Sequence, residues 1–224
     1  MLAGLTVILV HGLWMPGLVM QPLAHRLARQ GARTVLFSYP GRRRSLEDHG
    51  QRLSRLAKQL AGDAPVFFVG HSLGGLVVLE ALSRADAPEP GAVVLMGTPA
   101  RGCLAARRFA HWPGGRALLG ASRPLWEAGR QARWDRRAPL GVIAGSRPLG
   151  LGRALGRLPG RNDGVVCVEE TTVQGMRERI VLPVGHSGML VSPRVAREVT
   201  LFLAQGRFST GSEATAGAGS RDGG

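Results

Sequence analysis

Short runs of wholly apolar residues recur along the chain, separated by longer stretches in which apolar positions return every three or four residues. The short runs predict strands buried on both faces, and the longer stretches predict amphipathic helices. In chain order the predicted strands are Leu5–Val10, Thr34–Ser38, Val66–Val69, Ala92–Met96, Gly141–Ala144 and Ile180–Val184, with a further short strand at Val165–Val168. This alternation predicts an α/β fold with a mainly parallel central sheet and helices on both faces.

Two of the predicted helices carry clear start signals. Ser45 is placed to cap a helix that runs to Leu60, because its hydroxyl can accept a free N–H of the first turn. Ser192 and Pro193 open a last helix that ends near Gln205, since proline is tolerated at the first helical position. The other predicted helices are Gln21–Gln30 and Leu73–Arg84.

Two segments depart from the alternation and define the predicted organisation. Residues 1–208 are expected to form one domain, and the low-complexity tail 209–224 is expected to be disordered. Residues 101–139 are too long for a plain connection, so we expect an insert that forms a lid or cap over a binding pocket. Four apolar residues of this insert are expected either to line the acyl pocket or to pack as core; they are Leu118, Leu119, Leu125 and Trp126.

The segment Gly70-His71-Ser72-Leu73-Gly74 has the form G-x-S-x-G and lies between an apolar strand and an apolar helix. That context favours a tight strand-to-helix turn with the serine hydroxyl exposed at the carboxyl edge of the sheet. The glycines remove Cβ atoms that would clash across the turn. Ser72 is therefore the predicted nucleophile.

A serine nucleophile at such a turn is followed along the chain by its acid and then by its base. Asp163 follows the fifth predicted strand, and His186 follows the last one, 23 residues later. The carboxylate would orient the imidazole and stabilise its charged form while the imidazole takes the serine proton. The competing acids are Glu169, Glu170 and Asp135, and the less favoured histidines are His25, His49, His111 and His71.

Two backbone N–H groups are the predicted oxyanion donors. Leu73 follows the nucleophile at the helix N-terminus, and Leu13 follows His11-Gly12 at the end of the first strand. His11 precedes the serine in the chain, so we expect it to brace this loop rather than act as the base.

Composition and residue spacing argue against nucleic-acid, metal and membrane-spanning functions. The formal charge of +14 comes from 29 basic and 15 acidic residues spread along the whole chain, and no nucleic-acid-binding motif accompanies it, so no nucleic-acid partner is expected. No cluster of His, Cys and carboxylates has ligand spacing, and neither a metal nor an organic cofactor is expected. No apolar run is long enough to span a membrane, and no export signal precedes the first strand, so we expect a cytoplasmic protein.

Together these motifs resemble the α/β-hydrolase superfamily, and within it the bacterial lipases and esterases. His11-Gly12-Leu13 looks like their oxyanion segment, and Gly97-Thr98-Pro99 resembles a motif of lipases after the next strand. Ala100 stands where those lipases usually carry histidine, so the resemblance implies an esterase-like hydrolase. It implies cleavage of a small-molecule ester, lipid-like or not, through an acyl-enzyme. An acyltransferase or thioesterase with the same triad and a non-catalytic lipid- or partner-binding protein remain alternatives, and the oligomeric state stays open.

Overall fold

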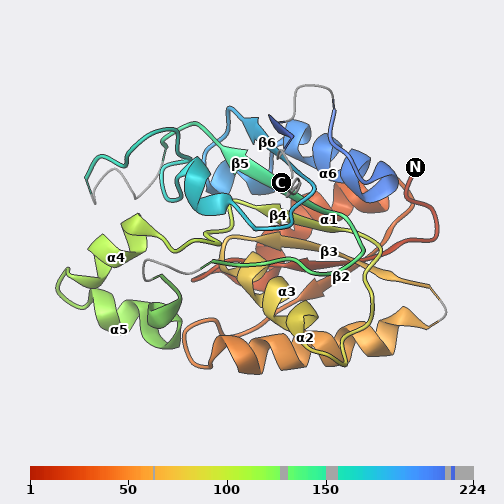
Figure 1. Cartoon of the computed structure of the whole chain (residues 1–224), viewed down its shortest axis with the longest axis horizontal. Coiled ribbons are helices and arrows are strands. Elements are labelled where there is room, and N and C mark those ends of the chain that lie inside the picture. Colours follow the sequence, from red (N-terminus) through yellow and green to blue (C-terminus); the bar gives the residue numbers. More distant parts are fainter. Residues whose placement is uncertain (63, 127–130, 150–155, 210–212, 215–224) are drawn as a thin grey trace, which may run out of the picture.

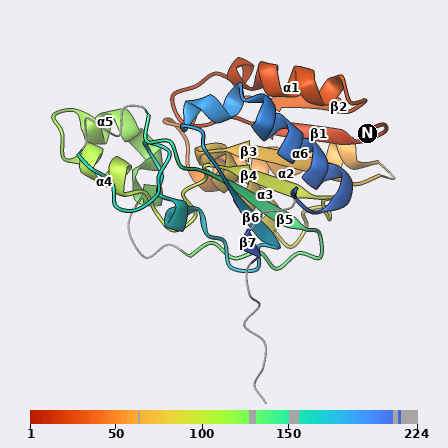
Figure 2. The same cartoon turned by 90° about the horizontal axis from the view of Figure 1, so that it is seen from above.

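A seven-stranded sheet organises the computed structural model, which describes the whole chain apart from residues 63, 127–130, 150–155, 210–212 and 215–224 (Figure 1). Six strands are parallel in the order β2-β1-β3-β4-β5-β6, and β7 joins the edge antiparallel (Figure 2 labels all of them). Their bounds are β1 Thr6–Val10, β2 Arg33–Phe37, β3 Val66–His71, β4 Val93–Met96, β5 Leu140–Gly145, β6 Glu178–Leu182 and β7 Glu213–Ala214. The predicted mainly parallel α/β sheet is confirmed.

Helices cover both faces of this sheet (Figure 2). Alternate side chains of β1 separate the two cores: Ile8 and Val10 pack with α2 and α3, whereas Val7 and Leu9 pack with α1 and α6. Because every second side chain of a strand points to the same face, a strand that is apolar throughout must be covered twice. The helix bounds are α1 Gln21–Ala28, α2 Leu46–Ala61, α3 Leu73–Ser83 and α6 Pro193–Gln205.

The predicted helix starts are confirmed. The hydroxyl of Ser45 accepts the N–H of Asp48, whose carboxylate in turn accepts the N–H of Ser45. The hydroxyl of Ser192 accepts the N–H of Val195 at the start of α6, with Pro193 in the first turn. These bonds, reciprocal at Ser45 and single at Ser192, satisfy N–H groups that have no partner within the helix.

The strand order creates a switch point between β1 and β3. The chain leaves β1 towards β2 on one side and later returns to place β3 on the other side. Loops that leave the carboxyl ends of two such strands diverge and open a crevice between them, which is where α/β sheets bind ligands. The predicted oxyanion segment, His11-Gly12-Leu13, follows β1 and Ser72 follows β3, so both lie at this crevice.

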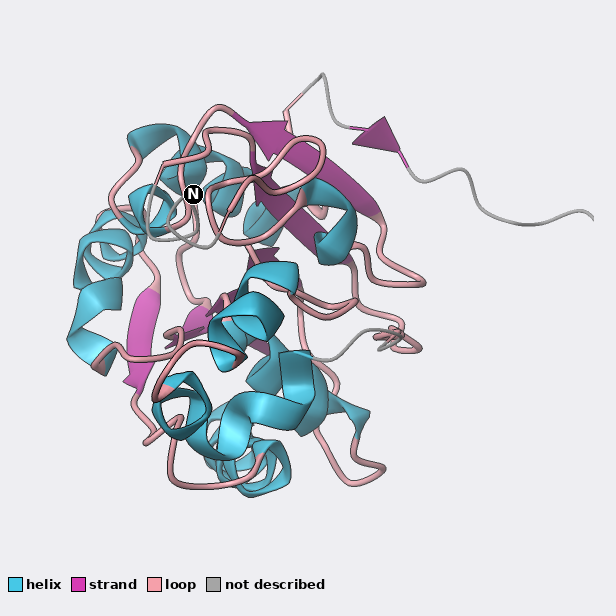
Figure 3. Ribbon diagram, turned by 90° about the vertical axis from the view of Figure 1, so that its left-hand side faces the viewer, coloured by secondary structure: helices cyan, strands magenta, loops and turns pink. Residues whose placement is uncertain are grey.

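Residues 101–139 leave the carboxyl end of β4, and their described part includes the short helices α4 Leu104–Ala110, α5 Gly115–Leu119 and the 3₁₀ helix η2 Gly120–Trp126. These helices lie beyond the end of the sheet that is remote from the N-terminus (Figures 1 and 2). Figure 3 views the molecule from that end, with the helices in front of the strands. The role of this segment as a lid or cap stays a prediction.

The C-terminal tail differs in part from the predicted disorder. Ser209 donates two hydrogen bonds to the carboxylate of Glu198, from its N–H over 2.9 Å and from its hydroxyl over 2.8 Å. Glu213 and Ala214 form β7, which pairs with Arg179 and Glu178 of β6. The edge strand of a sheet has free N–H and C=O groups, and two residues of the tail pair with those of β6. The predicted tail is otherwise 210–212 and 215–224, which lie outside the described residues.

Candidate active site

Ser72 lies at a sharp turn between β3 and α3. Its backbone has φ +53° and ψ −123°, a conformation that non-glycine residues rarely adopt. A Cβ on Gly70 would lie 2.5 Å from the Cα of Gly75, and one on Gly74 would lie 2.3 Å from the carbonyl oxygen of Val10. The glycines of the predicted motif therefore let the helix start pack directly against β3 and β1, and the turn carries its strain at the serine.

The side chains of Asp163 and His186 are paired behind this turn. The Nδ1 atom of His186 lies 2.7 Å from Oδ2 of Asp163, and both residues are buried. The same two residues also share a main-chain hydrogen bond, in which the N–H of His186 donates to the carbonyl oxygen of Asp163 over 2.9 Å. The loop after β5 and the loop after β6 are thus joined by both a side-chain and a main-chain hydrogen bond. Nε2 is the ring nitrogen of His186 that stays available for another partner.

The loop around Asp163 corrects the short strand predicted at Val165–Val168. Oδ1 of Asp163 accepts the N–H groups of Val165 and Val166 over 2.9 and 2.7 Å. A carboxylate that captures these groups bends the chain into a turn, so they cannot join a sheet. The 3₁₀ helix η4, Val168–Thr171, follows instead of a strand.

Asp163 is held in its charged form. Burial by itself would raise the pKa of this carboxyl, but the imidazole of His186 and the N–H groups of Val166 and Val165 outweigh burial and lower the pKa. Hydrogen bonds to the charged form of a carboxylate have this effect even in a dry environment. Asp163 therefore carries the negative charge needed to hold Nδ1 of His186 protonated.

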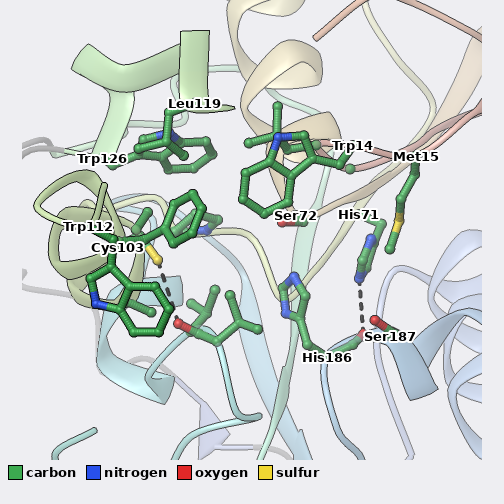
Figure 4. Close-up of a pocket in the computed structure, with 18 residues that line it drawn as sticks. Trp14, Met15, His71, Ser72, Cys103, Trp112, Leu119, Trp126, His186 and Ser187 are labelled. Atoms are coloured by element: carbon green, nitrogen blue, oxygen red, sulfur yellow. Dashed lines mark hydrogen bonds between the residues drawn. The ribbon is translucent and has the colours of Figure 1, made fainter. Parts of the chain in front are cut away.

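Ser72 and His186 line the same cavity (Figure 4). The hydroxyl of Ser72 makes no hydrogen bond with any residue that the structure describes, and Nε2 of His186 is likewise without a partner among them. Hydrogen bonds of catalytic groups are often open in the ligand-free state and close when substrate binds.

The predicted oxyanion donors are brought to the same crevice. A Cβ on Gly12 would lie 3.1 Å from Cβ of Ser72, so the segment after β1 passes close to the serine. Within the described chain, neither the N–H of Leu13 nor that of Leu73 donates to another residue. Free N–H groups that face the reacting serine can stabilise a developing oxyanion, and the assignment of Leu13 and Leu73 to this role stays a prediction.

His11 braces this segment. Its Nε2 accepts the N–H of Tyr39 over 3.2 Å, so the ring proton is on Nδ1, which donates to the carbonyl oxygen of Gly12 over 2.8 Å. The C=O of one residue and the N–H of the next point in opposite directions across a planar peptide. His11 therefore fixes the direction of the Leu13 N–H, while burial lowers the pKa of His11 and keeps the ring neutral.

The cavity beside Ser72 has a volume of about 240 Å³ and is lined almost entirely by apolar side chains. Of the four insert residues expected either to line the pocket or to pack as core, Leu119 and Trp126 do both, Leu125 packs against the core, and Leu118 is exposed. Sequence reasoning missed several lining residues, which are Trp14, Met15, Phe109 and Trp112. One signal in the sequence could have identified Trp14, namely its position next to the predicted oxyanion donor Leu13.

The competing acids have other partners. Glu170 accepts the N–H groups of Leu104 and Cys167 over 2.7 and 2.8 Å, and it thereby ties the start of α4 to η4. Glu169 and Asp135 pair with arginines at the surface. None of the three contacts His186, which leaves Asp163 as the acid beside it among the described residues.

Three of the four less favoured histidines lie away from the cavity, whereas His71 lines it and bonds through its Nε2 to the carbonyl oxygen of His186. His25 and His111 are exposed, on α1 and just after α4. His49 is buried on α2 against the ring of Tyr39. None of these side chains lines the cavity that holds Ser72.

The two cysteines, a metal site and a membrane-spanning helix are the remaining features to consider. Burial raises the pKa of Cys103 and of Cys167 to about 12, so both thiols are protonated at neutral pH. In the parts of the chain that the structure describes, no group of three His, Cys, Asp or Glu residues is arranged to hold a metal ion. The same parts contain no helix with the length and apolar character needed to cross a membrane.

Comparison with known proteins agrees with this architecture. The family model described as "Alpha/beta hydrolase family" matches residues 7–198. The mature lipase BlEst2 of Bacillus licheniformis is similar over 90% of this chain and 91% of its own, with 17% identity and a TM-score of 0.70. An esterase of Thermogutta terrifontis matches over 90% of each chain, with 17% identity and a TM-score of 0.65. A metagenomic carboxyl esterase matches over 82% of this chain and 65% of its own, with 23% identity and a TM-score of 0.63. A search of curated proteins finds no match.

Proposed function

Because the chain belongs to the alpha/beta hydrolase family, we propose that it is a serine esterase that cleaves carboxylic esters through Ser72, His186 and Asp163. The observation that carries this proposal is the buried 2.7 Å bond between Asp163 and His186 next to a strained serine in an apolar cavity. The fold alone hosts many activities, so the site carries the functional argument.

In the proposed reaction, Nε2 of His186 takes the proton of Ser72 as the serine oxygen attacks the acyl carbonyl carbon. The carbonyl oxygen becomes an oxyanion, which accepts the N–H groups of Leu13 and Leu73. Each donor would contribute about 3 kcal/mol to transition-state stabilisation, as oxyanion donors do elsewhere. His186 then donates its proton to the departing alcohol, and the acyl group stays on Ser72.

The second half of the reaction uses the same groups. Nε2 of His186 takes a proton from water, the resulting hydroxide oxygen attacks the acyl carbon, and Ser72 leaves with the proton restored. Asp163 stays ionised throughout and stabilises the imidazolium that forms in each half.

The character of the cavity indicates the class of substrate. An apolar wall next to the serine favours an apolar acyl or alcohol group over a charged one, because a charge would lose its hydration there without a partner. We therefore propose small esters with an aliphatic or aromatic portion as substrates. Soluble p-nitrophenyl esters of increasing chain length sample this class.

Hydrolysis of such an ester series tests the proposal, with Ser72→Ala and Ser187→Ala as a matched pair. Both serines line the cavity, but only Ser72 lies at the strained turn. We expect Ser187→Ala to keep most of the wild-type rate and Ser72→Ala to lose it. Product analysis with an added alcohol and with an acyl-CoA should give the free acid from the ester. Transfer of the acyl group to the alcohol would indicate an acyltransferase instead. A preference for the acyl-CoA thioester over the ester would indicate a thioesterase.

A further inference from the structure

Large apolar side chains are exposed almost exclusively at one edge of the molecule. Of the seven such side chains that the described residues expose, all but Met1 lie on connections that leave the carboxyl ends of parallel strands. These six are Trp14, Leu18, Trp112, Leu118, Leu149 and Val191. Because carboxyl ends of parallel strands meet at one edge, they share the edge that holds the Ser72 cavity. Apolar exposure concentrated in this way marks an interaction surface.

The aromatic members of this edge form a connected cluster. Nε1 of Trp14 donates to the carbonyl oxygen of Leu118 over 2.8 Å, which ties the segment after β1 to α5. The ring of Phe109 lies 5.4 Å from that of Trp14 and 6.2 Å from that of Trp112, measured between centroids. Trp14 and Trp112 are about half exposed, and both also line the cavity. The cavity therefore opens through a rim of half-exposed indoles.

Positive charge surrounds the same rim. Residues 101–126 contain five arginines and no aspartate or glutamate. The loop that carries Arg42, Arg43 and Arg44 packs against this segment, since Nη2 of Arg42 donates to the carbonyl oxygen of Ala117 over 3.2 Å. Arg43, Arg44 and Arg116 are exposed. Exposed indoles and arginines therefore occur together on these packed segments, and we call this the rim surface; its members are Trp14, Arg43, Arg44, Trp112, Arg116 and Leu118.

We propose that the rim surface docks on an anionic lipid bilayer, with the indoles in the headgroup region and the arginines on the lipid phosphates. Tryptophan is favoured at membrane interfaces because its ring is apolar and its N–H is polar, and basic side chains are attracted to anionic leaflets. A nucleic acid would pair with the arginines but leave the apolar rim in water, and a neutral bilayer would leave the arginines unpaired. In the docked orientation the cavity beside Ser72 opens onto the lipid. The proposal does not rest on ester hydrolysis.

Vesicle sedimentation tests this docking in the Ser72→Ala background, so that no lipid is turned over. The probes are vesicles of phosphatidylglycerol mixed with phosphatidylcholine and vesicles of phosphatidylcholine alone. The test variant is Arg43→Glu/Arg116→Glu on the rim surface. The control is Arg29→Glu/Arg33→Glu, which makes the same change in net charge at the opposite edge, where α1 ends and β2 begins. A thermal melt of each variant verifies that it is folded.

We expect binding to the anionic vesicles, at least about tenfold weaker partitioning for the rim variant, and a change within about twofold for the control. Leu118→Ser, which removes an exposed apolar side chain, should weaken binding as well. Absence of binding to the anionic vesicles, or equal losses in the two charge variants, would overturn the proposal. Equal binding to a single-stranded RNA with the same sensitivity to the rim variant would overturn it too, in favour of a general polyanion site.

Discussion

The Nε2–H group of His71 donates to the carbonyl oxygen of His186 over 3.1 Å, and the two rings lie 4.8 Å apart. A carbonyl can only accept, so the ring proton of His71 is on Nε2 (Figure 4). His71 directly precedes Ser72, which means that this bond joins the nucleophile turn to the loop of the proposed base. With the N–H of His186 bonded to Asp163, both main-chain groups of His186 are fixed.

His71 should make stability depend on pH. Complete burial lowers its pKa to about 3, whereas in the unfolded chain it titrates near 6.5. Below pH 6.5 the unfolded state therefore binds a proton that the folded state does not, and the free energy of unfolding should fall by about 1.4 kcal/mol per pH unit down to about pH 3. His71→Gln keeps a donor for the His186 carbonyl but cannot titrate.

Urea unfolding at pH 4.5, 5.5 and 7.5 measures this dependence as the difference between wild type and His71→Gln. Subtraction cancels the titration of the other groups, including His11 and His49, whose pKa values burial also lowers. We expect the stability of the variant relative to wild type to increase as the pH falls. Parallel pH profiles for the two proteins would show that His71 is not held neutral by burial.

Asp163→Asn tests the proposed acid. An asparagine keeps the shape of the side chain, but it removes the charge that stabilises the imidazolium and can present an N–H to Nδ1 of His186. We expect kcat for a p-nitrophenyl ester to fall by about 10³- to 10⁴-fold, as in other Ser-His-Asp sites. Asp135→Asn is the control, since Asp135 is exposed and pairs with Arg133. A loss of less than about tenfold in Asp163→Asn would place the acid elsewhere.

Gly97→Ala tests whether the space behind the acid–base pair matters. A Cβ on Gly97 would lie 3.1 Å from both Oδ2 of Asp163 and Nδ1 of His186. The substitution also strains a backbone with φ +55°, at a cost of about 1–2 kcal/mol. We expect kcat to fall by about tenfold or more with little change in KM, because the pair must shift.

Gly62→Ala provides the strain-only control for Gly97→Ala. Gly62 has φ +45°, and a Cβ there would meet no atom within 4 Å. We expect it to lower the melting temperature by a similar amount and to leave kcat unchanged. Equal kcat losses in the two alanine variants would mean that general destabilisation, and not displacement of the acid–base pair, explains the effect.

Ala106→Phe tests the cavity as the site of the apolar part of the substrate. Ala106 lies on α4 and lines the cavity, so the larger ring fills part of the 240 Å³. We expect kcat/KM to fall for p-nitrophenyl octanoate and to change little for the acetate. Ala117→Phe makes the same substitution at an exposed position outside the cavity lining. Unchanged chain-length preference in Ala106→Phe would exclude the cavity as the acyl or alcohol site.

The sheet and the turn at Ser72 are predictable from the sequence because their signals are local. A parallel strand covered on both faces is apolar throughout, and the strand-to-helix turn requires glycines two residues before and after the serine. Asp163 and His186 are also predictable, since each lies in a loop that follows a predicted strand. Because β5 and β6 are parallel neighbours, both loops leave the same edge of the sheet, and their hydrogen bonds then bring the two side chains together.

The rest depends on contacts between distant residues, which no local pattern reports. The segment Val165–Val168 has the composition of a strand, but the carboxylate of Asp163 takes two of its N–H groups. The positive φ of Trp14 accompanies a hydrogen bond to Leu118, 104 residues away. Helices α4 and α5 are too short for a periodicity to be recognised, and the aromatic rim they form with Trp14 exists only in three dimensions.

Reaction with a fluorophosphonate, followed by mass spectrometry of the peptides, tests the nucleophile most directly. The probe bonds covalently to an activated serine, so unlike an activity assay it identifies the residue without knowledge of the natural substrate. We predict stoichiometric addition to the peptide that contains Ser72, loss of addition in Ser72→Ala, and retention in Ser187→Ala. No addition to the wild type, or addition that persists in Ser72→Ala, would contradict the assignment of Ser72 as the nucleophile.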